Sequence, residues 1–388
     1  MRNGSWDGED RRRRLVGTHS HPGRFLLLAS ALLTLLAAMW AGLLRMDLEI
    51  PMLQPGLSLV HGPLMVCGFL GILISLERSV ALNRWWAYGA PVLTAAGTFF
   101  LGLGLPGRAG PLLILLGSAA LVWNFVIIVR RQTALFTVTT ALGAVAWLVG
   151  NIFWNSGAEI PTLVHWWAGF LVLTIAGERL ELSRLSSPRS GNNTFLLCCG
   201  LYLAGLVWAS LDHLRGLEVA GSGMLLLTVW LGRYDVARRT IRIPGLPRFI
   251  AIHLLAGYLW LAFAALLWIR ADRLYVNSEW QPFHYDAMLH SIFLGFAFSM
   301  IFAHAPIIFP AISSRPLTYR RAFYAHGALL HLALLLRIGS DLSGNFVSYR
   351  WSGIFLVTAI LLFLANTAIS LIGGERNPLP VAPSSPRG

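Results

Sequence analysis

Three of the eleven histidines in this chain lie near one end of long hydrophobic segments that contain almost no charged residues. His61 stands in LVHGPLMVCGF, His165 in LVHWWAGFLVL and His290 in AMLHSIFLGF. An imidazole ring inside hydrocarbon is costly unless it forms a hydrogen bond or binds a metal. Neutral imidazole is also the usual ligand of haem iron and of copper. The recurrence of histidine at one depth therefore predicts a ligand site within the membrane.

A fourth histidine, His331, lies at a similar depth on a segment that runs in the opposite direction. The four rings could therefore converge. Axial coordination of one haem needs two opposed histidines from facing helices, and we expect His61 and His290 to form this pair. His165 and His331 are then candidates for a second metal ion or for a five-coordinate haem. The alternative for each is a structural histidine that is hydrogen-bonded to a neighbouring helix.

Two charged residues could support the pair. Asp286 precedes His290 by four residues on the same helical face, so its carboxylate could orient the imidazole, or it could simply be an acidic residue that the helix dipole favours at a helix start. Arg337 is one of the few arginines on the outer side, where haem carboxylates would need partners. The other outer arginines considered for this role are Arg45, Arg270, Arg273 and Arg350.

A second group of histidines, His253, His304 and His326, lies near the opposite, inner ends of the segments. These residues could form an inner metal site, or they could cap helix ends. The pairs Glu77-Arg78 and Glu178-Arg179 occupy the same level, and we expect them to form ion pairs between helices.

The composition is typical of an integral membrane protein. The chain is 56% hydrophobic and 12% charged, with a mean hydropathy of +0.65, far more apolar than a soluble domain of this length. Apolar runs of about 20 residues each cross the hydrocarbon. We therefore expect an all-α integral membrane protein with a single domain at 23–374 and terminal tails, 1–22 and 375–388, that are disordered. Twelve segments are expected at 23–44, 57–76, 86–104, 111–129, 134–154, 160–177, 194–211, 217–236, 249–269, 283–304, 320–338 and 350–372.

Arginine supplies all 30 of the basic Lys and Arg side chains, and 23 of these arginines lie on the N-terminal side and in the even-numbered loops. The positive-inside rule then places both termini in the cytoplasm. The arginines are scattered over short loops and form no single face, which argues against nucleic-acid binding despite the net charge of +13. They would instead contact anionic membrane lipids. None of the three cysteines forms a haem-attachment motif, so a haem would be bound non-covalently.

A short pattern recurs every four segments. A glycine-phenylalanine-leucine stretch precedes a glutamate-arginine pair by nine residues in both the second and the sixth segment. In the tenth segment Gly295 follows His290, and His304 takes the position of the glutamates. These segments predict three repeats of four helices, at 23–129, 134–236 and 249–372.

This arrangement resembles that of the catalytic subunit of the haem-copper oxidases, whose ligands include histidines on the second, sixth and tenth helices. The resemblance is architectural only. The segment at 194–211 has no histidine, whereas that family has a histidine pair there for copper.

The tenth segment also resembles the NnrS family of twelve-helix bacterial membrane proteins, which contain haem and copper and are linked to nitric oxide metabolism. His290, Gly295, Met300 and Ile301 are similar to that family's H-x4-G-x4-M-I helix, and Arg315-Pro316-Leu317 resembles the G-R-P-L that follows it. The second segment is similar through His61 and Gly68-Phe69.

The NnrS resemblance implies a bacterial inner-membrane protein that binds b-type haem, with copper as a further candidate. Such a protein handles nitric oxide, another small diatomic or electrons, with an electron donor as a candidate partner. If it is an enzyme, it is a membrane oxidoreductase. The sequence departs from that family at Pro63 and Leu64, which replace a histidine and a glutamate, and at Phe309-Pro310-Ala311, which replaces G-H-T. Two alternatives stay open: a proton-coupled secondary transporter, and a membrane assembly or sensor protein without catalysis.

Overall fold

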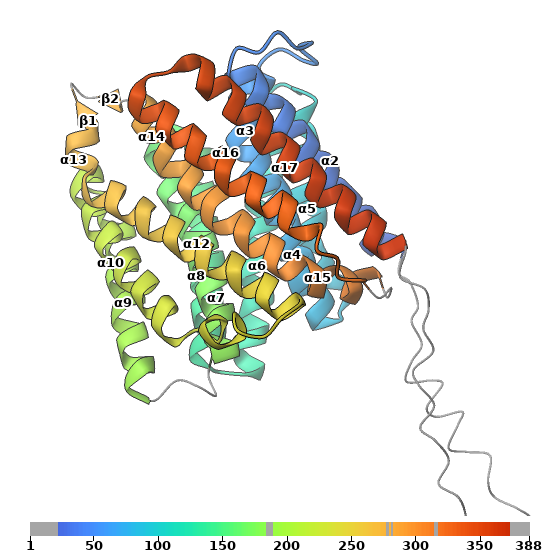
Figure 1. Ribbon diagram of the computed structural model, residues 1–388, viewed down its shortest axis with the longest axis vertical. Coiled ribbons are helices and arrows are strands. Elements are labelled where there is room, and N and C mark those ends of the chain that lie inside the picture. The colour runs from blue at the N-terminus through green and yellow to red at the C-terminus, as the bar shows by residue number, and fades with distance from the viewer. Residues whose placement is uncertain (1–21, 184–188, 277–278, 281, 314–316, 373–388) are drawn as a thin grey trace, which may run out of the picture.

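The computed structural model describes residues 22–183, 189–276, 279–280, 282–313 and 317–372, most of which lie in one bundle of helices (Figure 1). The tails predicted at 1–22 and 375–388 fall outside these residues, except for Pro22, where the first helix begins. Arg315 and Pro316, which belong to the motif after the tenth predicted segment, also fall outside them.

The elements follow one another along the chain as helices joined by short connections, with one pair of two-residue strands that are antiparallel. They are α2 (Pro22–Arg45), η1 (Leu57–Val60), α3 (His61–Pro63), η2 (Leu64–Leu70), α4 (Gly71–Leu82), η3 (Trp85–Tyr88), α5 (Gly89–Gly102), α6 (Ala109–Arg131), α7 (Leu135–Asn155), α8 (Ile160–Ser183), α9 (Arg189–Trp208), α10 (His213–Tyr234), α11 (Ala237–Thr240), α12 (Leu246–Ile269), α13 (Ala271–Leu274), β1 (Tyr275–Val276), β2 (Glu279–Trp280), α14 (Pro282–His290), η4 (Ser291–Phe298), α15 (Ser299–Ser313), α16 (Phe323–Ser343) and α17 (Phe346–Ile372).

Within the described residues, eleven helices are long and apolar enough to cross a membrane, which confirms the prediction of an all-α, multi-pass membrane protein. They correspond to eleven of the twelve predicted segments. The remaining segment, 86–104, forms the short turn η3 and then α5, which has 14 residues. This length is below the roughly 20 residues that an upright span needs. The third predicted segment is therefore helical, but its helix is shorter than a full membrane span.

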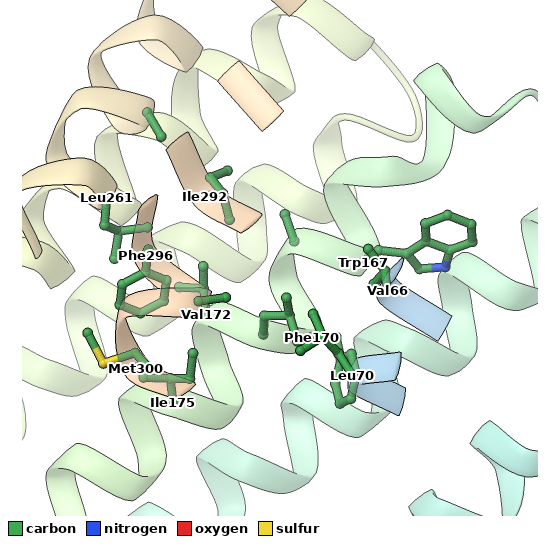
Figure 2. Packing of buried hydrophobic residues seen from close by; sticks show 14 of the residues in the cluster. Val66, Leu70, Trp167, Phe170, Val172, Ile175, Leu261, Ile292, Phe296 and Met300 are labelled. Atoms are coloured by element: carbon green, nitrogen blue, oxygen red, sulfur yellow. The ribbon is translucent and has the colours of Figure 1, made fainter. Parts of the chain in front are cut away.

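The second, sixth and tenth predicted segments meet inside the bundle. They correspond to α3 with η2 and α4, to α8, and to α14 with η4 and α15. The ring centroid of Phe69 in η2 lies 5.8 Å from that of Phe298 in η4. Figure 2 shows Phe170 and Val172 of α8 in the apolar packing between Leu70 of η2 and Phe296 of η4. These three segments thus share one core.

Two of these three segments contain a π-helical stretch directly after their histidine or within a turn of it. His61 opens α3, and η2 follows it; His290 ends α14, and η4 follows at once. A π-helical stretch inserts extra residues into an α-helix and is frequent at functional sites. The sixth segment, α8, is α-helical throughout.

Glycines allow close approach between neighbouring helices, as is usual in membrane proteins. A Cβ atom at Gly205 of α9 would overlap the backbone of Ala220 in α10, and one at Gly223 of α10 would overlap the backbone of Tyr202. The first and last long helices of the described residues are also in contact, since α2 lies beside α17 (Figure 1). Residues of both helices line one cavity, among them Met39 of α2 and Tyr349 of α17.

Candidate functional site

A cavity of about 430 Å³ lies among α2, α3, α14, α16 and α17. It brings together His61 and His290, the two histidines that the sequence singled out as a pair. Its lining is mixed. The polar side chains are Arg45, His61, Tyr285, Asp286, His290, Arg337 and Tyr349, and the thioethers are Met39, Met46 and Met65.

His61 is held on one side by the backbone of α2. Its Nδ1 atom lies 2.7 Å from the carbonyl oxygen of Ala38. A carbonyl oxygen only accepts hydrogen bonds, so the Nδ1 atom holds the ring proton and the Nε2 atom retains a lone pair. Gly42 makes room for the ring, because a Cβ at that position would lie 2.9 Å from Cε1 of His61. His61 therefore has a fixed position and a free ligand atom.

His290 has the same hydrogen-bonding arrangement. Its Nδ1 atom lies 3.0 Å from the backbone oxygen of Asp286 and 3.1 Å from the carboxylate Oδ2 of the same residue. Both partners accept hydrogen bonds, so the Nε2 atom of the neutral ring again keeps its lone pair. The expected orientation of this imidazole by the Asp286 carboxylate is thus present in the structure.

Asp286 is itself fixed by Arg337 of α16. The Nε and Nη2 atoms of Arg337 donate hydrogen bonds to the two carboxylate oxygens at 2.7 and 2.8 Å. The Nη2 atom also donates to the hydroxyl of Tyr349 in α17 at 3.0 Å. A bidentate arginine-carboxylate pair is geometrically specific as well as strong. Three helices are therefore joined beside His290.

His165 does not line this cavity. It is buried within α8, and its ring centroid lies 5.5 Å from that of His213 at the start of α10. The predicted convergence of His165 with His61 and His290 is therefore not what the geometry shows. No pattern in the sequence singles out His213, which is the first residue of α10.

His331 does not line the cavity either. The Nε1 atom of Trp260 donates a hydrogen bond to Nδ1 of His331 at 3.1 Å. Indole nitrogen is only a donor, so Nδ1 of His331 is an acceptor, and the ring proton of the neutral imidazole lies on Nε2. Neither nitrogen of this tautomer offers a free lone pair to a metal. The nearest histidine is His253, at 5.8 Å between ring centroids.

The three inner histidines are separated into two environments. His253 and His326 both lie against Phe302, at 6.1 and 4.8 Å between ring centroids. The amide of Asn366 donates to Nδ1 of His326 at 3.2 Å. His304 instead accepts a hydrogen bond from Arg179 at 3.3 Å through Nε2. Across the described ranges, no group of three or more His, Cys, Asp or Glu side chains is placed to hold a metal ion.

Ion pairs join the helices at the end of the bundle that contains His304. Arg78 of α4 pairs with Glu178 of α8, which confirms the predicted interhelix ion pair. Arg179 donates two hydrogen bonds to Asp235, at 2.7 and 2.8 Å, and the hydroxyl of Tyr258 donates a third at 2.7 Å. His304 is thus part of a buried ionic network.

The fold and the cavity define a multi-pass α-helical membrane protein with two imidazoles facing one internal site. The chain belongs to the family described as Domain of unknown function (DUF8744), whose model matches residues 24–372. This match extends from α2 to the end of α17 and so includes the whole cavity. None of the curated proteins compared with the chain matches it.

Proposed function

We propose that this protein binds haem within the membrane, with His61 and His290 as ligands of the iron, and that it handles nitric oxide, another small diatomic or electrons. One observation carries the proposal: both histidines line the same cavity, and the Nδ1 atom of each is hydrogen-bonded to an acceptor. A hydrogen bond from Nδ1 fixes the tautomer that coordinates a metal through Nε2.

Three of the other histidines support this choice by contrast, whereas His253, whose Nδ1 atom lies 2.9 Å from the carbonyl oxygen of Phe249, shares the arrangement but does not line the cavity. In His331 and His326 the Nδ1 atom accepts a hydrogen bond, and in His304 the Nε2 atom accepts one from Arg179. In the neutral rings of His331 and His326 the Nε2 atom therefore carries the proton, and in His304 the lone pair of Nε2 is already hydrogen-bonded. None of these Nε2 atoms has a free lone pair for a metal. His61 and His290 are the pair whose free nitrogen atoms belong to residues of one cavity.

The remaining lining residues suit an amphipathic cofactor. A volume of about 430 Å³ falls in the usual range for cofactor sites. Arg45, which is exposed at the end of α2, would pair with the carboxylates of a haem, while Arg337 remains paired with Asp286. A bound haem would supply one-electron chemistry and a binding position for a diatomic molecule.

The proposal includes the membrane orientation and the three internal repeats that the sequence predicts. Three repeats of four helices would place both termini on the cytoplasmic side of a bacterial inner membrane, with the cavity in the opposite half. The paired π-helical stretches after His61 and His290 support a common origin of the second and tenth segments. The resemblance to the NnrS family rests on the same segments.

A second candidate ligand is copper, and one observation favours it. The thioethers of Met39, Met46 and Met65 line the cavity together with the two imidazoles. Thioether sulfur is a soft donor that selects Cu(I). Met39 lies on α2, and Met46 follows directly after the end of this helix.

A metal and pyridine-haemochrome assay on the detergent-solubilised protein from haem-replete cells separates these candidates. Haem binding predicts a Soret band that shifts on reduction and a haemochrome spectrum of the b type. Copper without haem would favour the second candidate, and a colourless protein without either metal would reject both.

A further inference from the structure

A second cavity, separate from the one that His61 and His290 line, lies at the far end of α17. Its volume is about 430 Å³. The residues that line it, as far as the structure describes them, are Thr318 and Arg320 before α16 and Ile369, Ser370 and Ile372 at the end of α17. One cation, two hydroxyl groups and two apolar side chains thus surround one space.

Hydrogen bonds join the two walls of this cavity. The backbone N–H of Thr318 donates to the carbonyl oxygen of Ser370 at 3.4 Å. One helical turn earlier on α17, the side-chain amide of Asn366 donates to the carbonyl oxygen of Ala322 at 3.3 Å. The segment before α16 is therefore held against α17, and the cavity is largely preformed, as is usual for ligand sites.

Two of the lining side chains have polar groups that the protein leaves unsatisfied. Ser370 is 1% exposed, and its hydroxyl forms no hydrogen bond with the part of the chain that the structure describes. Arg320 is exposed, and the described lining contains no Asp or Glu residue to pair with its guanidinium group. A buried hydroxyl and an uncompensated cation both favour a ligand that is negatively charged and accepts hydrogen bonds. A phosphate group has both properties.

The apolar part of the lining indicates where that phosphate comes from. Ile369 and Ile372 are 51% and 78% exposed, and both belong to a helix that is long and apolar enough to cross a membrane. The end of such a helix lies at the level where lipid acyl chains meet their headgroups. A soluble phosphate ion would leave these side chains uncovered, whereas a phospholipid covers them with its acyl chain.

We propose that this cavity binds one anionic phospholipid. Arg320 pairs with the phosphate, the hydroxyl of Ser370 donates a hydrogen bond to the headgroup, and the acyl chain lies on Ile369 and Ile372. A zwitterionic lipid fits less well, because the described lining offers its ammonium group no carboxylate. The site lies apart from the cavity of the proposed haem, so neither proposal depends on the other.

Native mass spectrometry of the full-length protein tests this proposal, after release from membranes that contain equal amounts of phosphatidylglycerol and phosphatidylcholine. We expect the wild type to retain phosphatidylglycerol in preference. Arg320→Gln should bind this lipid about fivefold more weakly, since one arginine near an anionic lipid contributes about that factor. Ser370→Ala should also retain less of it. The matched control is Arg84→Gln, because Arg84 is exposed and lies outside the described lining.

Equal retention of the two lipids by the wild type would overturn the proposal, and so would an equal loss in Arg84→Gln and Arg320→Gln. If Arg320→Gln does not fold, Ser370→Ala alone must show the loss, and unchanged lipid binding in that variant contradicts the site. Excess inorganic phosphate distinguishes the two sources of the phosphate group. The lipid should stay bound in its presence, and its displacement would show a site for a soluble anion instead. A colourless protein that passes these tests keeps the lipid site and loses only the haem.

Discussion

Arg337 on α16 donates hydrogen bonds to both carboxylate oxygens of Asp286 on α14, at 2.7 and 2.8 Å. The two residues are 51 positions apart in the chain, and both line the cavity. Asp286 in turn contacts Nδ1 of His290. The orientation of one proposed iron ligand therefore depends on an arginine from a different helix.

Replacement of Arg337 by Met should destabilise the protein, because it leaves the Asp286 carboxylate without its cation. Breaking a buried ion pair by removing one partner costs about 3–5 kcal/mol. Thermal unfolding in detergent, followed by circular dichroism, measures the loss. The double variant Arg337→Met with Asp286→Leu should recover most of the stability, since it removes both charges. A double variant as unstable as the single one would contradict this explanation.

Substitution of Gly42 by Ala should weaken haem binding without disturbing the rest of the bundle. The new Cβ would lie 2.9 Å from Cε1 of His61 and would push the ring from its hydrogen bond with Ala38. Overpacking costs about 1–3 kcal/mol, which corresponds to about tenfold or more in affinity. Haem titration of the apoprotein measures the effect. Gly89→Ala is the control, because a Cβ there meets nothing within 4 Å; equal affinities in the two variants would refute the prediction.

Two glycines of α16 should respond oppositely to alanine. A Cβ at Gly327 would overlap Nε2 of His253, so Gly327→Ala should lower the stability by about 1–3 kcal/mol. A Cβ at Gly339 meets nothing within 4 Å, so Gly339→Ala should be neutral or should gain up to about 1 kcal/mol from helix propensity. Unfolding midpoints of the two variants provide the comparison. A stabilised Gly327→Ala variant would show that His253 is not seated against this glycine.

The ionic network around Asp235 should lose stability when one donor is removed. Tyr258→Phe deletes the hydroxyl that donates to Asp235 at 2.7 Å. Hydrogen bonds to charged groups contribute about 1.5–3 kcal/mol, and we expect a loss of this size in the free energy of unfolding. Tyr234→Phe is the control, since the ring contacts of Tyr234 with Trp230 and Arg233 survive the change. Equal stability of both variants would mean that the hydroxyl of Tyr258 contributes nothing.

Hydropathy and charge were sufficient to predict a multi-pass helical protein, because a membrane span needs a long apolar run. They could not predict that the segment at 86–104 forms only 14 helical residues after a 3₁₀ turn. An apolar run sets the greatest length of a helix and not its actual length. The π-helical stretches after His61 and His290 were not predicted, because hydropathy does not distinguish π-helical from α-helical turns.

The expected common depth of His61 and His290 was sufficient to predict that they form one pair, and both line the same cavity. Depth does not specify which neighbour a ring faces, and the structure places His165 and His331 outside this cavity. His165 faces His213, and Trp260 occupies the Nδ1 atom of His331. Hydrogen bonds to the ring nitrogens are tertiary contacts, and they distinguish ligand candidates that sequence position alone makes equivalent.

The haem content of cavity variants tests the central claim most directly. His61→Gly and His290→Gly, purified beside the wild type and a His331→Ala control, should each lose most of the haem measured as pyridine haemochrome. Added imidazole, which can occupy the vacated space, should restore binding to the two glycine variants. Wild-type haem content in both glycine variants, or an equal loss in His331→Ala, would contradict coordination by His61 and His290.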